Sequence, residues 1–148
     1  MKKALIGAGC FWGIEELYRK IDGVIDTKVG YSGGHTNNPN YEEVCQGDTN
    51  HAEVVQINFD ENKISYKKIL DYFWDCHDPT QLNRQGPDRG TQYRSVIFYY
   101  NNIQLEEAKK SRSLKQLLIK KYIVTEIIPF KEFFIAEDYH QLFICKRA

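Results

Sequence analysis

The chain has 148 residues, 42% of them hydrophobic, and its 20 Lys and Arg residues balance 20 Asp and Glu residues. This length suits one domain with a single core, so we expect residues 1–148 to form one unit. The balanced charge argues against nucleic acid as a partner, and no apolar stretch approaches the ~20 residues that span a bilayer. The first residues lead directly into a predicted strand and leave no room for a secretory signal, so we expect a cytoplasmic protein.

The spacing of apolar residues predicts an α+β fold. The expected elements are strands over about 3–8, 24–31, 51–60, 94–100 and 123–128, and helices over about 11–20, 65–77 and 103–122. The order β-α-β-β-α-β with an appended helix and strand predicts a two-layer α/β sandwich with a ferredoxin-like split βαβ core. A doubly wound parallel sheet fits less well, because no helix separates the second and third strands.

Two long irregular segments interrupt these elements, at residues 32–50 and 78–90. The first is rich in glycine and asparagine, and we expect one helical turn in it at about 41–45. Loops of this length are uncommon in compact domains and tend to carry function.

Cys10 stands between a glycine-rich strand end and the first helix. Unpaired N–H groups and the helix dipole at a helix N-terminus favour an anion, so this position predicts a lowered pKa and a reactive thiolate. Phe11 and Trp12 follow as an aromatic wall suited to a small, partly apolar substrate. The alternative is a buried structural cysteine, although glycines on both sides favour close approach to the sulfur.

The other three cysteines are Cys45, Cys76 and Cys145. Without a secretory signal we expect reduced thiols. No C-x-x-C pair is present, and the adjacent Cys76 and His77 lack a second ligand pair, so we expect no metal site. Glu53 begins a strand next to valines, where burial would raise the pKa of its carboxyl and let it hold a proton near neutrality.

Six ordered motifs closely resemble those of the peptide methionine sulfoxide reductase A family and cover nearly the whole chain. They are Gly9-Cys10-Phe11-Trp12-Gly13, Tyr31-Ser32-Gly33-Gly34, His51-Ala52-Glu53-Val54, His77-Asp78-Pro79-Thr80, Gly90-Thr91-Gln92-Tyr93-Arg94-Ser95 and Ala136-Glu137-Asp138-Tyr139-His140-Gln141.

The resemblance implies an enzyme that repairs oxidative damage by reducing the S epimer of methionine sulfoxide, protein-bound and free. It assigns Cys10 as the nucleophile that attacks sulfur and becomes a sulfenic acid, and Glu53 as the general acid. It also implies that the hydroxyls of Tyr41 and Tyr93 stabilise the sulfoxide oxygen and that Phe11 and Trp12 form a pocket for the methyl group. Asp88 and His140 would orient the substrate. The resemblance implies no bound cofactor, and thioredoxin or another dithiol would be the reductant. We expect the protein to be a monomer.

Two departures from the family pattern concern the end of the chain. Many members carry a glycine-rich C-terminal extension with the resolving cysteine, whereas this sequence ends at Ala148, and Phe143 stands where a tyrosine is frequent. We expect Cys145, in a mobile terminal segment, to resolve the sulfenic acid. Cys45 and direct attack by an external thiol remain alternatives, and Cys76 is expected in the core.

Two other classes of function remain open. One is a different thiol enzyme, a peroxidase or a thioesterase, that uses Cys10 on another electrophile. The other is a binding module that has the pocket without catalysis.

Overall fold

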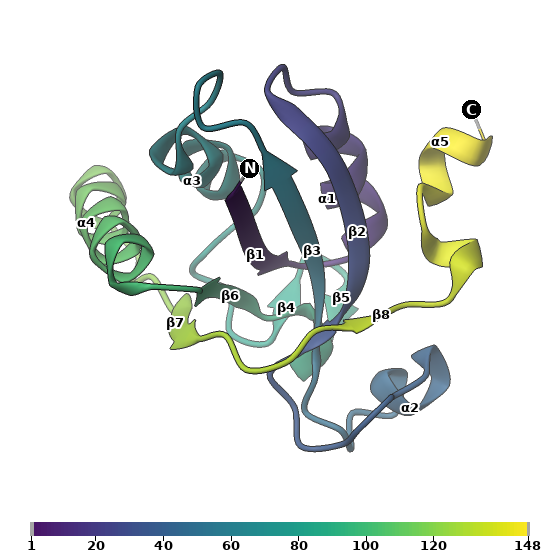
Figure 1. The fold of residues 1–148 in the computed structure, drawn as a ribbon. Coiled ribbons are helices and arrows are strands. Elements are labelled where there is room, and N and C mark those ends of the chain that lie inside the picture. Colours follow the sequence, from purple (N-terminus) through teal and green to yellow (C-terminus); the bar gives the residue numbers. More distant parts are fainter. Residues whose placement is uncertain (1, 148) are drawn as a thin grey trace.

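The computed structural model describes residues 2–147 as a sheet with helices packed on it (Figure 1). Its strands are β1 (Lys2–Ala8), β2 (Val24–Ser32), β3 (Ala52–Phe59), β4 (Arg84–Gln85), β5 (Asp88–Arg89), β6 (Ser95–Tyr99), β7 (Glu126–Pro129) and β8 (Phe134–Ile135). Its helices are α1 (Phe11–Arg19), α2 (Tyr41–Cys45), α3 (Tyr66–Asp75), α4 (Asn102–Leu118) and α5 (Phe143–Arg147), with 3-10 turns η1 (Thr91–Tyr93) and η2 (Asp138–His140).

Six strands form the main sheet in the order β7-β6-β1-β3-β2-β8. The neighbours β1 and β3, β1 and β6, and β2 and β3 are antiparallel, whereas β6 and β7 are parallel. The β1-α1-β2 unit has β3 between its strands, and the β3-α3-β6 unit has β1 between its strands. This interleaving places β1 and β3 in the centre of the sheet, and α1 begins just beyond the end of β1.

Alternate residues of the central strands enter two apolar clusters. Ile6 of β1 belongs to the larger cluster, which also takes the buried faces of α1, α3 and α4. Its neighbour Leu5 belongs to the smaller cluster, where Phe130 and Phe133 of the C-terminal segment pack. Helices therefore cover one face of the sheet, and the chain after β7 covers part of the other.

The C-terminal segment crosses the sheet from β7 to its opposite edge. There β8 pairs with Gly30 and Tyr31 of β2, and the Ser32 hydroxyl donates a hydrogen bond to the Glu132 carbonyl. A Cβ on Gly30 would lie 2.4 Å from the Phe134 carbonyl oxygen and 2.6 Å from the Phe133 ring. The close approach of the two chain segments therefore requires glycine at position 30.

The expected mixed α/β architecture is confirmed, but several element boundaries differ. Helix α4 ends at Leu118, not near residue 122, and the last predicted strand begins at Glu126, not at residue 123. The Gln116 side chain accepts the N–H of Ile123 and donates to the Lys121 carbonyl, so it holds a turn where the pattern predicted helix and strand.

Three short elements lie where the sequence predicted irregular chain. They are the β4–β5 hairpin within the second long loop, strand β8, and helix α5 at the C-terminal end. Each of these strands and helices is two to five residues long, too short for a hydrophobic period to be read. The C-terminal segment, which the sequence predicted to be mobile, therefore contains a helix that contacts α1.

Substituting Gly30 by Ala should destabilise the protein by about 1–3 kcal/mol, because the added methyl overlaps the Phe134 backbone and must displace it. Gly13→Ala in α1 is the matched control, since a Cβ there meets no described atom within 4 Å and alanine favours helix by up to ~1 kcal/mol. Urea unfolding of both variants measures the difference. Equal stability of the two variants would contradict the close packing of β8 on β2.

Candidate active site

The thiol of Cys10 lies at the N-terminus of α1, as predicted. Gly9 before it has φ +98°, a conformation that side chains rarely adopt, and Cys10 itself occupies the N-cap position. This turn carries the chain out of the sheet and leaves the cysteine half-buried. The backbone N–H groups of Trp12 and Gly13 face its sulfur.

The pKa of Cys10 is nevertheless raised, to about 11, which corrects the expectation of a lowered value. Burial is the largest cause, and the nearby carboxyls of Glu53 and Asp88 add to it. Together they outweigh the two N–H groups that lower the pKa. Without substrate, Cys10 therefore carries its proton at neutral pH.

Glu53 reaches the same helix N-terminus from β3. It is 1% exposed, and its Oε1 accepts the N–H of Phe11, the residue after Cys10, at 3.2 Å. Burial is the main cause that raises its pKa to about 8, although the Phe11 N–H opposes the shift. As expected from its position at the start of a buried strand, the carboxyl holds a proton at neutral pH, and it does so beside the thiol.

Tyr41 and Tyr93 come from the two long loops, the first at the start of α2 and the second at the end of η1. Burial raises the pKa of both hydroxyls, that of Tyr93 to about 12, with Glu53 contributing to each shift. Both hydroxyls are therefore hydrogen-bond donors at neutral pH. Asp88, in the β4–β5 hairpin, contributes to the raised pKa of Cys10, Glu53 and Tyr93, so it lies within electrostatic range of all three.

The aromatic wall beside Cys10 consists of Phe11 and Trp12, which pack on His140 and Phe143. Phe11 is buried, and its ring centroid lies 5.3 Å from that of His140. The indole Nε1 of Trp12 donates to His140 Nδ1 at 2.9 Å, and its ring stacks on Phe143 at 3.8 Å. Phe143 thus fills the position of the frequent tyrosine as a stacking partner.

His140 is 1% exposed, and its pKa is lowered by burial. Because the indole can only donate, Nδ1 must be the acceptor, and the neutral ring carries its proton on Nε2. Nε2 is buried and has no hydrogen-bond partner among the described residues. The site therefore contains one free donor beside the aromatic wall.

Three further side chains fix this arrangement: Glu15, which the sequence reasoning missed, and Glu137 and Gln141, which stand in the last of the six motifs but had no assigned role. The buried Glu15 accepts the Thr27 hydroxyl and the Leu142 N–H, both at 2.7 Å. The Gln141 amide bonds both the N–H and the carbonyl of Val29. A signal for Glu15 was available, since a carboxylate on the apolar face of α1 requires buried partners.

The other cysteines occupy three different places. Cys45, at the exposed end of α2, interacts with the Tyr41 hydroxyl and lies within electrostatic range of Glu53. Cys145 lies on α5 within electrostatic range of Arg19, at the end of α1 farthest from Cys10. The nine residues of α1 span about 13 Å, so this conformation does not bring Cys145 to Cys10. Cys76 ends α3, and its thiol donates to the Phe73 carbonyl.

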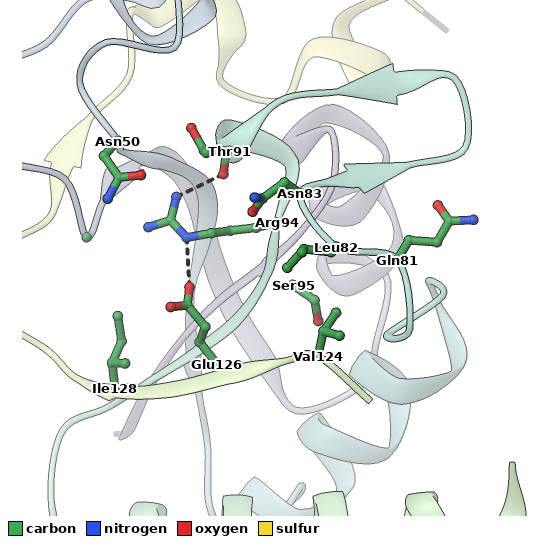
Figure 2. A pocket seen from close by; sticks show the side chains of 11 residues that line it. Asn50, Gln81, Leu82, Asn83, Thr91, Arg94, Ser95, Val124, Glu126 and Ile128 are labelled. Carbon is green, nitrogen blue, oxygen red and sulfur yellow. Dashed lines mark hydrogen bonds and ion pairs between the residues drawn. The ribbon is translucent and has the colours of Figure 1, made fainter. Parts of the chain in front are cut away.

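A separate cavity of about 350 Å³ lies around Arg94 (Figure 2). There the Arg94 guanidinium donates to Glu126 at 2.9 Å and to the Thr91 carbonyl at 2.8 Å. A Cβ on Gly33 would lie 3.0 Å from Arg94 Nη2, so the glycine leaves room for this group. The cavity borders neither Cys10 nor Glu53, and Arg94 serves the site by fixing the η1 turn that carries Tyr93.

Two observations concern metals and membranes. Within residues 2–147, no three His, Cys, Asp or Glu side chains are grouped so that they could hold a metal ion. None of the helices described over that range combines the length and apolar character needed to cross a membrane.

A cysteine at a helix N-terminus, a protonated carboxyl against the same turn and two neutral tyrosines bring a thiol and three proton-bearing groups into one site. The sequence model of the family described as "Peptide methionine sulfoxide reductase" matches residues 2–148. The chain belongs to this family.

Relatives and solved structures of the family match nearly the whole chain. A protein of Methanosarcina acetivorans named peptide methionine sulfoxide reductase MsrA is 55% identical, covering 100% of this chain and 80% of its own length. The MsrA of Methanothermobacter thermautotrophicus is 53% identical over 98% of this chain and 87% of its own. The crystal structure of reduced Mxr1 from Saccharomyces cerevisiae superimposes with a TM-score of 0.94 at 41% identity, covering 98% of this chain and 84% of that one.

Replacing Glu53 by Gln should change how stability depends on pH. The native carboxyl takes up its proton near pH 8 and the unfolded one near 4.5, so between these values the native state binds more protons. The wild type should then lose about 1.4 kcal/mol of unfolding free energy per pH unit as the pH rises through this window, a loss that the Glu53→Gln variant cannot show. Urea unfolding at pH values of about 5, 6.5 and 8 measures both slopes. Parallel pH profiles would mean that Glu53 titrates normally.

Proposed function

We propose that the protein reduces the S epimer of methionine sulfoxide, free and within proteins, to methionine, with thiol-dependent recycling. One observation carries the proposal: Glu53, with a pKa of about 8, bonds the N–H next to Cys10, so a proton donor and a nucleophile share one helix N-terminus. Reduction of a sulfoxide requires both at once, because sulfur is attacked while its oxygen is protonated. That the protein is cytoplasmic, is a monomer and binds no cofactor stays a prediction.

The reductive step transfers one oxygen. Cys10 attacks the sulfoxide sulfur and forms an S–S bond while Glu53 delivers a proton to the oxygen. The S–O bond of the substrate then breaks, the oxygen passes as hydroxyl to the Cys10 sulfur, and cleavage of the S–S bond releases methionine as the thioether and leaves Cys10 as a sulfenic acid. The thiol proton is released as the oxygen gains one, so protons balance. Tyr41 and Tyr93 donate hydrogen bonds to the oxygen as its charge develops.

The two faces of the site suit different groups on the sulfoxide. Phe11 and Trp12 offer an apolar surface for the S-methyl group, while Glu53, Tyr41 and Tyr93 supply donors for the oxygen. Exchanging the two groups would place the oxygen against the aromatic wall at a cost of roughly 1–3 kcal/mol. We expect the free Nε2–H of His140 and the carboxyl of Asp88 to orient the rest of the substrate.

The rival functions fit this geometry less well. A peroxide-reducing cysteine depends on a resting thiolate of low pKa, whereas the thiol of Cys10 has a pKa of about 11. A thioesterase needs a base to activate the attacking group, and Glu53 is protonated. A binding module would not require the buried acid beside the thiol.

The sulfenic acid must be returned to a thiol by a second thiol. A structure of Mxr1 from Saccharomyces cerevisiae in complex with Trx2 matches this chain with a TM-score of 0.69 at 30% identity, covering 94% of this chain and 83% of that one. It supports a thioredoxin as the final reductant. For the thiol that attacks first, the surroundings of Cys45 near Tyr41 favour it over Cys145, which would need α5 to leave α1.

The reaction is tested by single-turnover reduction of each epimer by the reduced enzyme. Glu53→Gln should slow reduction of the S epimer by about 10²-fold, the usual scale for a positioned acid, and Cys10→Ser should abolish it. Retained turnover in the serine variant would exclude Cys10 as the nucleophile. Equal consumption of both epimers by the wild type would contradict the assigned pocket.

Recycling is tested with Cys45→Ser and Cys145→Ser as a matched pair, using thioredoxin as reductant. Both should complete the first turnover. We expect Cys45→Ser to accumulate Cys10 sulfenic acid and to cycle slowly, whereas Cys145→Ser should cycle like the wild type, and mass spectrometry identifies the oxidised species. Slow cycling of Cys145→Ser alone would restore Cys145 as the resolving thiol, and wild-type cycling of both would assign the step to the external thiol.

A further inference from the structure

Glu137, in the C-terminal segment, joins two tyrosines from different parts of the site. Its Oε1 accepts the Tyr31 hydroxyl at 3.0 Å, and its Oε2 accepts the backbone N–H of Tyr41 at 3.0 Å. These two bonds connect residues 106 and 96 positions apart in the sequence. A single carboxylate therefore fastens the start of α2 to β2 of the sheet.

The attachment matters because α2 has few other anchors. It is five residues long, and Val44 is its one buried residue. Its capping box, in which Asn40 and Glu43 bond each other's N–H, holds the helix together without fixing its place on the protein. The first N–H of the helix is the group that Glu137 accepts, at the end where a negative charge is favoured.

The far side of this bond is rigid. Tyr31 is fully buried within β2, where it pairs with Glu53 of β3 and with Phe134 of β8. Its ring also packs on Phe11, with ring centroids 5.8 Å apart. Glu137 thus ties α2, which carries Tyr41, to β2, the strand that pairs with Glu53.

We propose that Glu137 is a positioning residue that sets where the Tyr41 hydroxyl meets the sulfoxide oxygen. The inference rests on the proposed role of Tyr41. Glu137 itself touches neither Cys10 nor the acid, and it acts through the backbone N–H from which the Tyr41 side chain departs. When this bond is lost, α2 keeps its capping box and the Tyr41 ring keeps its packing on His140, with ring centroids 4.5 Å apart, but the backbone from which the phenol departs loses its attachment to Tyr31.

A double-mutant cycle tests this role, with the single-turnover rate of sulfoxide reduction as readout. The substitution Glu137→Gln keeps the size of the side chain but replaces the charged acceptor with a neutral amide. The Tyr41 N–H then keeps at most a weaker bond, and the Tyr31 hydroxyl must accept from the amide instead of donating to the carboxylate. It should lower the rate about tenfold with little change in KM. In a Tyr41→Phe background the same substitution should change the rate less than about twofold, because the hydroxyl that it positions is already absent.

Glu43→Gln is the matched control, since it weakens the cap of the same helix without touching the link to Tyr31. It should leave the rate within about twofold of wild type. Hydrogen exchange of the α2 amides adds a readout independent of activity, and it should become faster in Glu137→Gln.

Each outcome decides the matter. If the losses from Glu137→Gln and Tyr41→Phe multiply in the double variant, or if Glu137→Gln is silent, Glu137 does not act through Tyr41 and the proposal is wrong. If Tyr41→Phe alone leaves the single-turnover rate unchanged, Tyr41 does not have the proposed role, and the proposal for Glu137 is wrong as well. In that case, loss of activity in Cys10→Ser would still support sulfoxide reduction by Cys10. Failure of the proposal for Glu137 can therefore be told apart from failure of the proposed function.

Discussion

The contact between the Glu53 carboxyl and the first N–H of α1 is the interaction on which the site depends. It exists because β3 and β1 are adjacent central strands, so the start of β3 lies beside the end of β1 from which α1 departs. Burial between these elements keeps the carboxyl protonated, and the carboxyl in turn contributes to the raised pKa of Cys10. The acid and the thiol therefore share one buried environment, and a change in the charge of Glu53 changes the pKa of Cys10.

The C-terminal segment supplies the opposite half of the site. Its bonds reach far back along the chain: His140 to Trp12, Gln141 to Val29 and Leu142 to Glu15. Since these partners lie on α1 and β2, the segment closes the site only when that helix and that strand are in place. Loss of the segment would remove His140 and Phe143, the ring partners of Phe11 and Trp12, and with them the free donor of His140, while leaving most of the larger apolar cluster intact.

The longer elements of the fold and the protonated state of Glu53 could be predicted from the sequence. The longer strands and helices follow the period of their apolar residues, and the raised pKa of Glu53 follows from its valine neighbours. The pKa of Cys10 was predicted in the wrong direction, because the helix N-terminus is a local feature, whereas the burial that mainly raises the pKa and the carboxyls of Glu53 and Asp88 that add to it depend on distant segments. The packing of α5 on α1 was missed for the same reason, since it depends on Trp12 meeting Phe143.

A resting thiol of raised pKa suits an enzyme that meets oxidants while it waits for substrate. Peroxides and related oxidants attack the thiolate, so a protonated Cys10 is protected when the site is empty. In the proposed reaction, binding of a sulfoxide would change this balance, because a proton shared between Glu53 and the oxygen would place positive charge on the sulfur next to Cys10. That charge would favour the thiolate at the moment of attack, so the burial that keeps Cys10 unreactive in the empty site would leave its activation to the substrate.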